Sequence, residues 1–250
     1  MAYFDATVIP VPTANKGQFL DHARAVDPVF LEHGAIRVVE GWGDDVAHGQ
    51  VTDFYRAVAA TQDESIAFSW IEWPDKATRD RAWGAMMNPD HPDPRLDPAQ
   101  NPMPFDGKRM IHGGFTSIVT EGDHTACPYI QGFMVPVPTA KRDAYTQMAA
   151  EAWDMFTGYG ALGVLEAWGD DVPRGQTTDF YSGVNATEPE SVVFSYMLWP
   201  SREVCQEAAK KMREAEMPAD FEMPFDGMRM VWGGFEPILM LDGASRSERA

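Results

Sequence analysis

Apolar positions in the first half of the chain follow first the spacing of a strand and then that of a helix. Residues 3–11 are almost continuously apolar, which predicts a buried strand. Thr13 is a suitable N-cap for a following amphipathic helix. The apolar residues that recur at helical spacing are Phe19, Ala23, Val26 and Phe30. Gly34 comes next, at the position where a left-handed glycine ends many helices.

The remaining pattern predicts more strands and a second helix. Residues 35–42, 52–60 and 65–73 read as extended runs, and Asp75 is placed to cap another helix. An Asp-Gly turn at residues 106–107 then leads into a last strand. The order β-α-β-β-β-α-β is close to the split βαβ, or ferredoxin-like, arrangement.

The whole pattern occurs twice. Trp-Gly-Asp-Asp-Val at residues 42–46 returns at 168–172, and Met-Pro-Phe-Asp-Gly at 103–107 returns at 223–227. The offset falls from 126 to 120 between these motifs, so the first copy carries six extra residues around its Pro/Asp-rich segment. Fixed-offset similarity of this kind indicates a repeated structural unit. We therefore predict domains at residues 1–122 and 127–242 and a disordered tail at 243–250.

Two such units solve a packing problem. One ferredoxin-like unit leaves a sheet face without helices, and a second unit can cover that face. We expect an α+β fold in which two tandem ferredoxin-like units pack sheet to sheet as a pseudo-dimeric α/β barrel. Since duplication supplies the partner internally, a monomer is expected.

The composition limits the partners, the localisation and the cofactors that are expected for the protein. The 250 residues carry a formal net charge of −18, which repels phosphate backbones and anionic membranes, so neither nucleic acid nor membrane is expected as a partner. The N-terminal residues lack the features of a signal peptide, and with only two cysteines a cytoplasmic protein is expected. No metal-ligand spacing or cofactor motif occurs, so no metal and no cofactor is predicted.

Three segments resemble a known family. They are residues 52–54 (Thr-Asp-Phe), 68–74 (Phe-Ser-Trp-Ile-Glu-Trp-Pro) and 103–115 (Met-Pro-Phe-Asp-Gly-Lys-Arg-Met-Ile-His-Gly-Gly-Phe). The sequence resembles the YbaA-like bacterial proteins, a domain-of-unknown-function family within the dimeric α/β barrel superfamily. The resemblance implies that this chain is an internal pseudo-dimer. The wider superfamily includes monooxygenases, isomerases, haem enzymes and ligand-sensing domains.

Polar residues on apolar strand faces are the first candidates for chemistry. Strand alternation places Glu40 beside Trp42, and the second copy repeats this with Glu166 and Trp168. Arg109 and Arg229 are predicted to share apolar faces of the last strands, so a Glu–Arg contact in each half would satisfy both charges. Such a cluster is either an acid–base and anion-binding site or a structural ion pair.

A second set lies on the predicted run at 52–60. Asp53 and Tyr55, with Asp179 and Tyr181 in the second copy, either orient a ligand or stabilise a strand end. Ser69 lies on the next strand and could assist.

The halves differ at His112, which is Trp232 in the second copy. A site is therefore expected in the first half.

These observations support three hypotheses. The leading one is a small-molecule-binding protein whose barrel cavity takes an apolar or aromatic ligand, with the arginines suited to an anion. The second is a cofactor-independent monooxygenase or isomerase. The third is a structural or interaction protein without a small ligand, in which the barrel is filled and an apolar patch is exposed.

Overall fold

The computed structural model describes residues 1–214 and 222–243, and the predicted tail beyond Gly243 lies outside them. The elements of the first repeat are β1 (Tyr3–Pro12), α1 (Lys16–Glu32), β2 (Arg37–Asp45), α2 (Phe54–Ala57), β3 (Glu64–Trp73), α3 (Lys76–Met86) and β4 (Ile111–Gly122). Those of the second repeat are β5 (Tyr129–Pro138), α4 (Arg142–Glu151), α5 (Trp153–Gly158), β6 (Gly163–Asp171), α6 (Phe180–Gly183), β7 (Glu190–Trp199), α7 (Arg202–Glu214) and β8 (Val231–Asp242).

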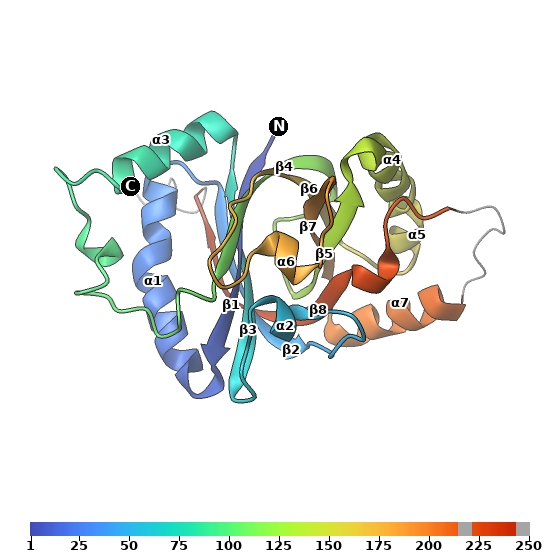
Figure 1. Cartoon of the computed structure of the whole chain (residues 1–250), viewed down its shortest axis with the longest axis horizontal. Helices are drawn as coiled ribbons and strands as arrows, with labels where there is room; N and C mark the ends of the chain where they lie inside the picture. Colours follow the sequence, from blue (N-terminus) through green and yellow to red (C-terminus); the bar gives the residue numbers. More distant parts are fainter. Residues whose placement is uncertain (215–221, 244–250) are drawn as a thin grey trace.

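The eight strands form one closed α+β barrel in the order β1-β3-β2-β8-β5-β7-β6-β4 (Figure 1). All neighbouring strands are antiparallel. The repeats join along two seams, β2 with β8 and β4 with β6. Closure pairs every strand on both sides, which removes the exposed edges that an open sheet would present.

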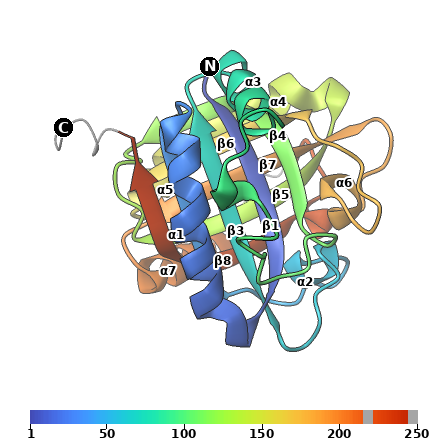
Figure 2. The same cartoon turned by 90° about the vertical axis from the view of Figure 1, so that its left-hand side faces the viewer.

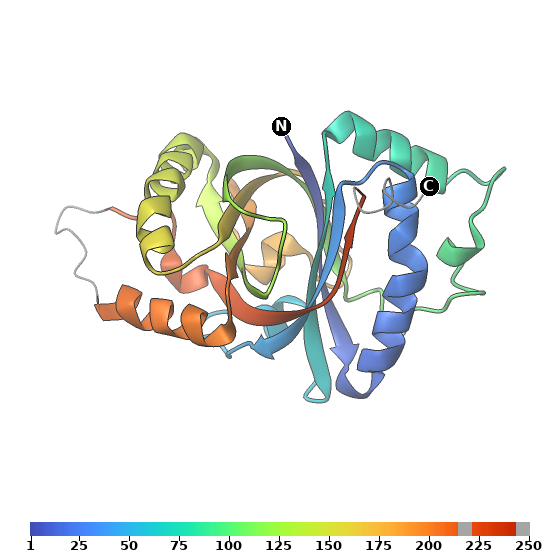
Figure 3. The ribbon, with the colours of Figure 1, turned by 180° about the vertical axis from the view of Figure 1, so that it is seen from behind.

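Helices cover the barrel on two opposite sides. Helices α1 and α3 lie on one side, and α4, α5 and α7 lie on the other (Figures 1 and 3). Figure 2 shows α1 running across the strands of the first side, where it contacts β2 and β8 at their seam. The predicted helix stop at Gly34 is confirmed, since this residue has φ of 100°, and Gly160 has the same φ at the corresponding place in the second repeat. Among the described helices, none is long and apolar enough to cross a bilayer.

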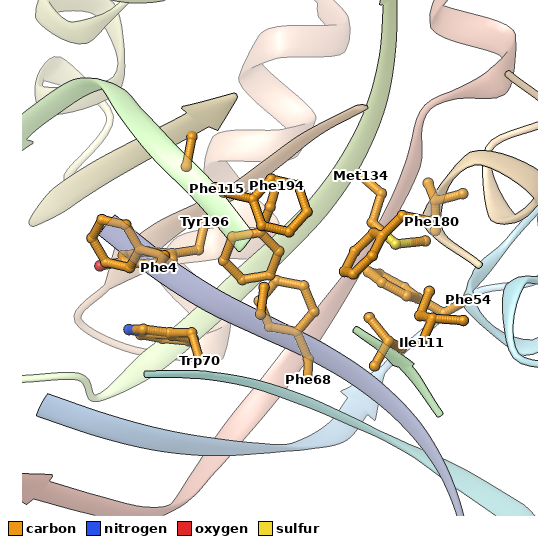
Figure 4. Close-up of a cluster of buried hydrophobic side chains, with 14 of the residues drawn as sticks. Phe4, Phe54, Phe68, Trp70, Ile111, Phe115, Met134, Phe180, Phe194 and Tyr196 are labelled. Atoms are coloured by element: carbon orange, nitrogen blue, oxygen red, sulfur yellow. The ribbon is translucent and has the colours of Figure 1, made fainter. Parts of the chain in front are cut away.

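The barrel interior is filled with aromatic rings (Figure 4). Phe68 stacks on Phe194 with ring centroids 4.8 Å apart, and Trp70 stacks on Tyr196 at 4.2 Å. A Cβ at Gly132 would lie 2.7 Å from the ring of Phe68, so only glycine leaves room for that ring. The prediction of a ligand cavity between the sheets is therefore corrected, because these side chains occupy that space.

One end of the barrel is closed by two short helices, which corrects the strand predicted at residues 52–60. Asp53 Oδ1 accepts a hydrogen bond of 2.8 Å from the backbone amide of Arg56, so the segment turns into α2. The equivalent Asp179 starts α6 in the same way. Phe54 and Phe180 enter the core from these helices. The repeated Thr-Asp-Phe-Tyr motif thus forms a plug.

Candidate functional site

Four polar side chains cross the outer face of the first repeat's strands in one row. His112 lies opposite Thr7, Thr7 opposite Ser69, and Ser69 opposite Glu40. His112 is exposed and Thr7 half-buried, whereas Ser69 is 3% and Glu40 8% exposed. The Ser69 hydroxyl donates a hydrogen bond to Glu40 Oε2. The row, defined here as the polar row, therefore leads from solvent to a buried carboxyl group.

Helix α1 adds a second buried carboxyl group to this end of the row. Asp27 is 4% exposed, and its Oδ2 atom has no hydrogen-bond partner among the described residues. Burial, and then the charge of Glu40, raise the pKa of Asp27 well above its usual range. Burial also raises the pKa of Glu40 to about 7, against the lowering effect of the Ser69 hydrogen bond. Two carboxyl groups placed together in this way favour holding a proton near neutral pH.

A surface groove of about 790 Å³ lies on the same side of the barrel. Its lining includes Gln18, His22, Asn101, Phe105 and Arg109. Asn101 and Phe105 come from the segment that follows α3, and Asn101 Oδ1 lies 3.1 Å from His22 Nδ1. The groove thus combines amide, imidazole and aromatic groups, a mixture typical of small-molecule sites.

An aromatic layer separates the groove from the carboxyl pair. The ring of Phe105 lies 6.0 Å from that of Phe19, which in turn lies 6.0 Å from that of Trp42. Trp42 and Glu40 share the outer face of β2, as their strand positions predicted. A molecule in the groove would therefore meet Phe105 before it reached Glu40.

The second repeat keeps only part of the polar row. Glu166 and Ser195 remain, but Phe133 replaces Thr7 and Trp232 replaces His112. The hydroxyl of Tyr145, which stands where the first repeat has Phe19, donates a 2.7 Å hydrogen bond to Glu166. Burial raises the pKa of Glu166 to about 7 as well. The carboxyl group is retained here, but its polar route to solvent is not.

The predicted contact of Glu40 with Arg109 is wrong. Arg109 precedes β4 and makes two 2.7 Å bonds to Glu64, and Arg229 pairs with Glu190 at 2.7 and 2.8 Å. These hydrogen bonds hold the pKa of Glu64 at about 2. Both arginines also bond a backbone carbonyl near the barrel plug. Their geometry is that of a structural clamp repeated in both halves.

The residues of the plug lie apart from the polar row. Asp53 and Asp179 are buried and bond backbone amides of their own turns. The half-buried Tyr55 packs against His48, with ring centroids 4.7 Å apart, and Arg174 lies 3.9 Å from the ring centroid of Tyr181. Trp168, like Trp42, packs under the helices outside the barrel.

Two members of the site escaped the sequence analysis. Asp27 follows Phe19 and Ala23 at intervals of four, so a carboxylate on that apolar stripe was a signal. Thr7 faces the same side as Asp5 and Ile9 through strand alternation. In the described part of the chain, no group of three or more His, Cys, Asp and Glu side chains is arranged to hold a metal ion.

The architecture and this site together define a closed α+β barrel protein with buried carboxyl groups beneath its helices. Solved structures share the fold at low sequence identity. An anthrone oxidase-like protein matches with a TM-score of 0.56 and 11% identity, over 97% of this chain and 93% of the other. A protein of Lactobacillus acidophilus NCFM described as a "putative monooxygenase" matches at 0.53 and 7%, over 97% and 96%.

The chain belongs to the family described as "Protein of unknown function (DUF1428)", which matches residues 2–107 and 128–227. Protein YbaA of Escherichia coli strain K12 is 48% identical over 121 residues, which cover 48% of this chain and 100% of YbaA. The resemblance drawn from the sequence motifs is thus confirmed.

Proposed function

We propose that the first repeat binds a small, largely aromatic molecule between α1 and the strands and exchanges a proton with it through Glu40. The observation that carries this proposal is the polar row, which leads from the exposed His112 to the buried Glu40, with Asp27 of α1 beside it. A general base works best when its pKa lies near the operating pH, and burial brings that of Glu40 to about 7.

The chemistry belongs to the class of cofactor-independent monooxygenases or isomerases. The Glu40 carboxylate takes a proton from a carbon next to a carbonyl group, while the buried Asp27, whose pKa is raised well above its usual range, stays protonated. The resulting carbanion either regains the proton elsewhere or reacts with oxygen. The half-buried Phe105 is the side chain that moves to admit the ligand from the groove.

The barrel architecture supports the same proposal. The main elements of each repeat follow the order β-α-β and then β-α-β again, which fits a ferredoxin-like unit. The two repeats together fit the single-chain counterpart of a two-subunit barrel. One ligand site per chain follows from the divergence between the two polar rows, and a monomer is proposed because the duplication supplies the second unit.

Anthrone is a suitable probe, because one structural neighbour is described as anthrone oxidase-like. Removal of a C10 proton and reaction with O2 converts anthrone to anthraquinone and water. We expect the wild-type protein to form anthraquinone faster than buffer. Glu40→Gln should lower the rate about 100-fold or more, as loss of a general base does. Glu166→Gln is the matched control and should retain the rate.

Exchange of the C10 hydrogen into D2O, followed by NMR, measures the proton transfer without oxygen. If the wild-type protein accelerates neither oxidation nor exchange, the proposed reaction is wrong. Equal loss in Glu40→Gln and Glu166→Gln would also contradict it, since the site would then not be specific to the first repeat.

A further inference from the structure

A second pocket, of about 270 Å³, opens in the other repeat between α7 and the outer faces of β5 and β8. Its lining includes Gln131, Cys205, Ala209, Arg213 and Trp232. It lies on the far side of the barrel from the polar row. An apolar cavity of about 150 Å³ already accepts benzene, so this pocket has room for a larger ring system.

The difference between the repeats explains why the pocket exists. In the first repeat the corresponding place is filled by Trp83, whose indole N–H donates a 2.8 Å hydrogen bond to Asp5, and by Arg79, which bonds the same carboxylate. The second repeat has Ala209 and Cys205 at the equivalent positions of its helix. A bicyclic aromatic side chain is thus missing from a place shaped to hold one.

The residue at the floor of the pocket also differs from its counterpart in the first repeat in the hydrogen bonds that it can make. Asp5, an acceptor, is replaced by Gln131, which is 6% exposed. Its Oε1 atom accepts the indole N–H of Trp199 at 3.1 Å. No hydrogen bond occupies its amide nitrogen within the described residues, and this nitrogen is not among the fully buried unpaired atoms, so its two N–H groups are open to a ligand in the pocket that Gln131 lines. A ligand that brings an acceptor can bond this amide in place of water.

Charge and shape restrict the ligand further. Asp45 and Arg213 bring opposite charges to the lining. Burial raises the pKa of Cys205 to about 12, so the thiol is neutral at pH 7. The indole of Trp232 is 42% exposed and offers a flat surface at the rim. A planar, uncharged molecule fits these features.

We propose that this pocket binds a neutral bicyclic aromatic carbonyl compound. The ring system takes the place that Trp83 occupies in the first repeat and packs against Ala209 and Trp232. The carbonyl oxygen accepts a hydrogen bond from the Gln131 amide. This binding site is separate from the polar row.

The test compares 1-indanone with indole, two molecules of nearly the same shape. Indanone presents an acceptor, whereas indole presents a donor. Isothermal titration should give one indanone site per chain, with indole at least 10-fold weaker. Ala209→Trp restores the residue of the first repeat and should weaken indanone binding at least 10-fold. Should that variant fail to fold, Cys205→Met fills the same pocket from the helix.

Several outcomes would overturn the proposal. They are undetectable indanone binding to the wild-type protein, unchanged binding after the pocket is filled, or equal affinity for indole and indanone. Glu40→Gln should leave indanone binding unchanged, and Ala209→Trp should leave anthrone oxidation unchanged. These crossed controls separate a failure of this pocket from a failure of the polar row.

Discussion

The ring of Phe68 lies against that of Phe194 inside the barrel, with 4.8 Å between centroids and 14° between planes. One ring comes from each repeat, at equivalent positions of β3 and β7. Both side chains are fully buried. The stack makes the two halves of the core a single packing unit.

Replacing Phe68 with alanine should therefore destabilise the whole barrel. We expect a loss of about 3–5 kcal/mol in the free energy of unfolding, the range for removing a buried phenylalanine. Phe105→Ala, at the half-buried groove, is the control and should cost less. Equilibrium denaturation measures both. A smaller loss for Phe68→Ala than for Phe105→Ala would contradict the role of the stack.

Stability should fall as the pH rises from about 4.5 to 7 and beyond. Burial raises the folded-state pKa of Glu40 and Glu166 from 4.5 to about 7, so the folded state binds protons that the unfolded chain has released. Each group contributes at most roughly 3 kcal/mol, which is present below pH 4.5 and lost through this window.

Thermal melts between pH 5 and 8 test this expectation. Glutamine cannot ionise, so the fall in melting temperature should be smaller in Glu40→Gln and in Glu166→Gln. The double variant should show the flattest profile. A wild-type slope in all three variants would mean that other groups cause the pH dependence.

The arginine clamps should act in the opposite pH range. Hydrogen bonds from Arg109 and Arg229 lower the pKa of Glu64 and Glu190 from 4.5 to about 2. Their stabilising effect is present above pH 4.5 and is lost as the pH falls toward 2. Arg109→Ala and Arg229→Ala should each cost about 1–3 kcal/mol at pH 7.

The informative result is whether Arg109→Ala and Arg229→Ala lose the same free energy of unfolding. If Arg109 served mainly to bind an anionic ligand, its removal would reduce ligand binding and leave the free energy of unfolding unchanged. A structural clamp predicts similar losses in both variants, measured by denaturation at pH 7 and again at pH 3.

The plug should depend on its capping aspartates. Asp53 Oδ1 accepts the Arg56 amide, and Asp179 Oδ1 accepts the Ser182 amide at 2.7 Å. Replacing either with alanine should cost about 1 kcal/mol, as loss of an N-cap does. Asn retains the acceptor and should restore most of the stability. Failure of Asn to do so would show that the charge, rather than the cap, matters.

The repeats and the shared face of Glu40 and Trp42 could be read from the sequence, because motif similarity and strand alternation are local signals. The sequence predicts the ligand site inside the barrel, and the structure corrects this, since the face with Glu40 and Trp42 lies outside it. Helix α2 could not be read from the sequence, since Phe54 and Tyr55 favour strands and only the Asp53 cap and burial of Phe54 decide for a helix. Tertiary packing overrode the local preference there.

The partners of polar groups were the hardest to predict. Glu40 meets Asp27 because α1 lies across β2, and Arg109 meets Glu64 because the loop before β4 returns to the start of β3. Both contacts depend on where elements lie in space, which neither period nor composition encodes. The prediction that paired Glu40 with Arg109, because both were expected on apolar strand faces, therefore joined the wrong residues.

The two seams between β2 and β8 and between β4 and β6 have an evolutionary consequence. In a barrel assembled from two identical subunits, every mutation is made twice, and both faces must tolerate it. Here a mutation is made once. One face accordingly carries Phe133 at the position where the other carries Thr7. Covalent joining thus lets one gene shape two unlike surfaces on a shared core.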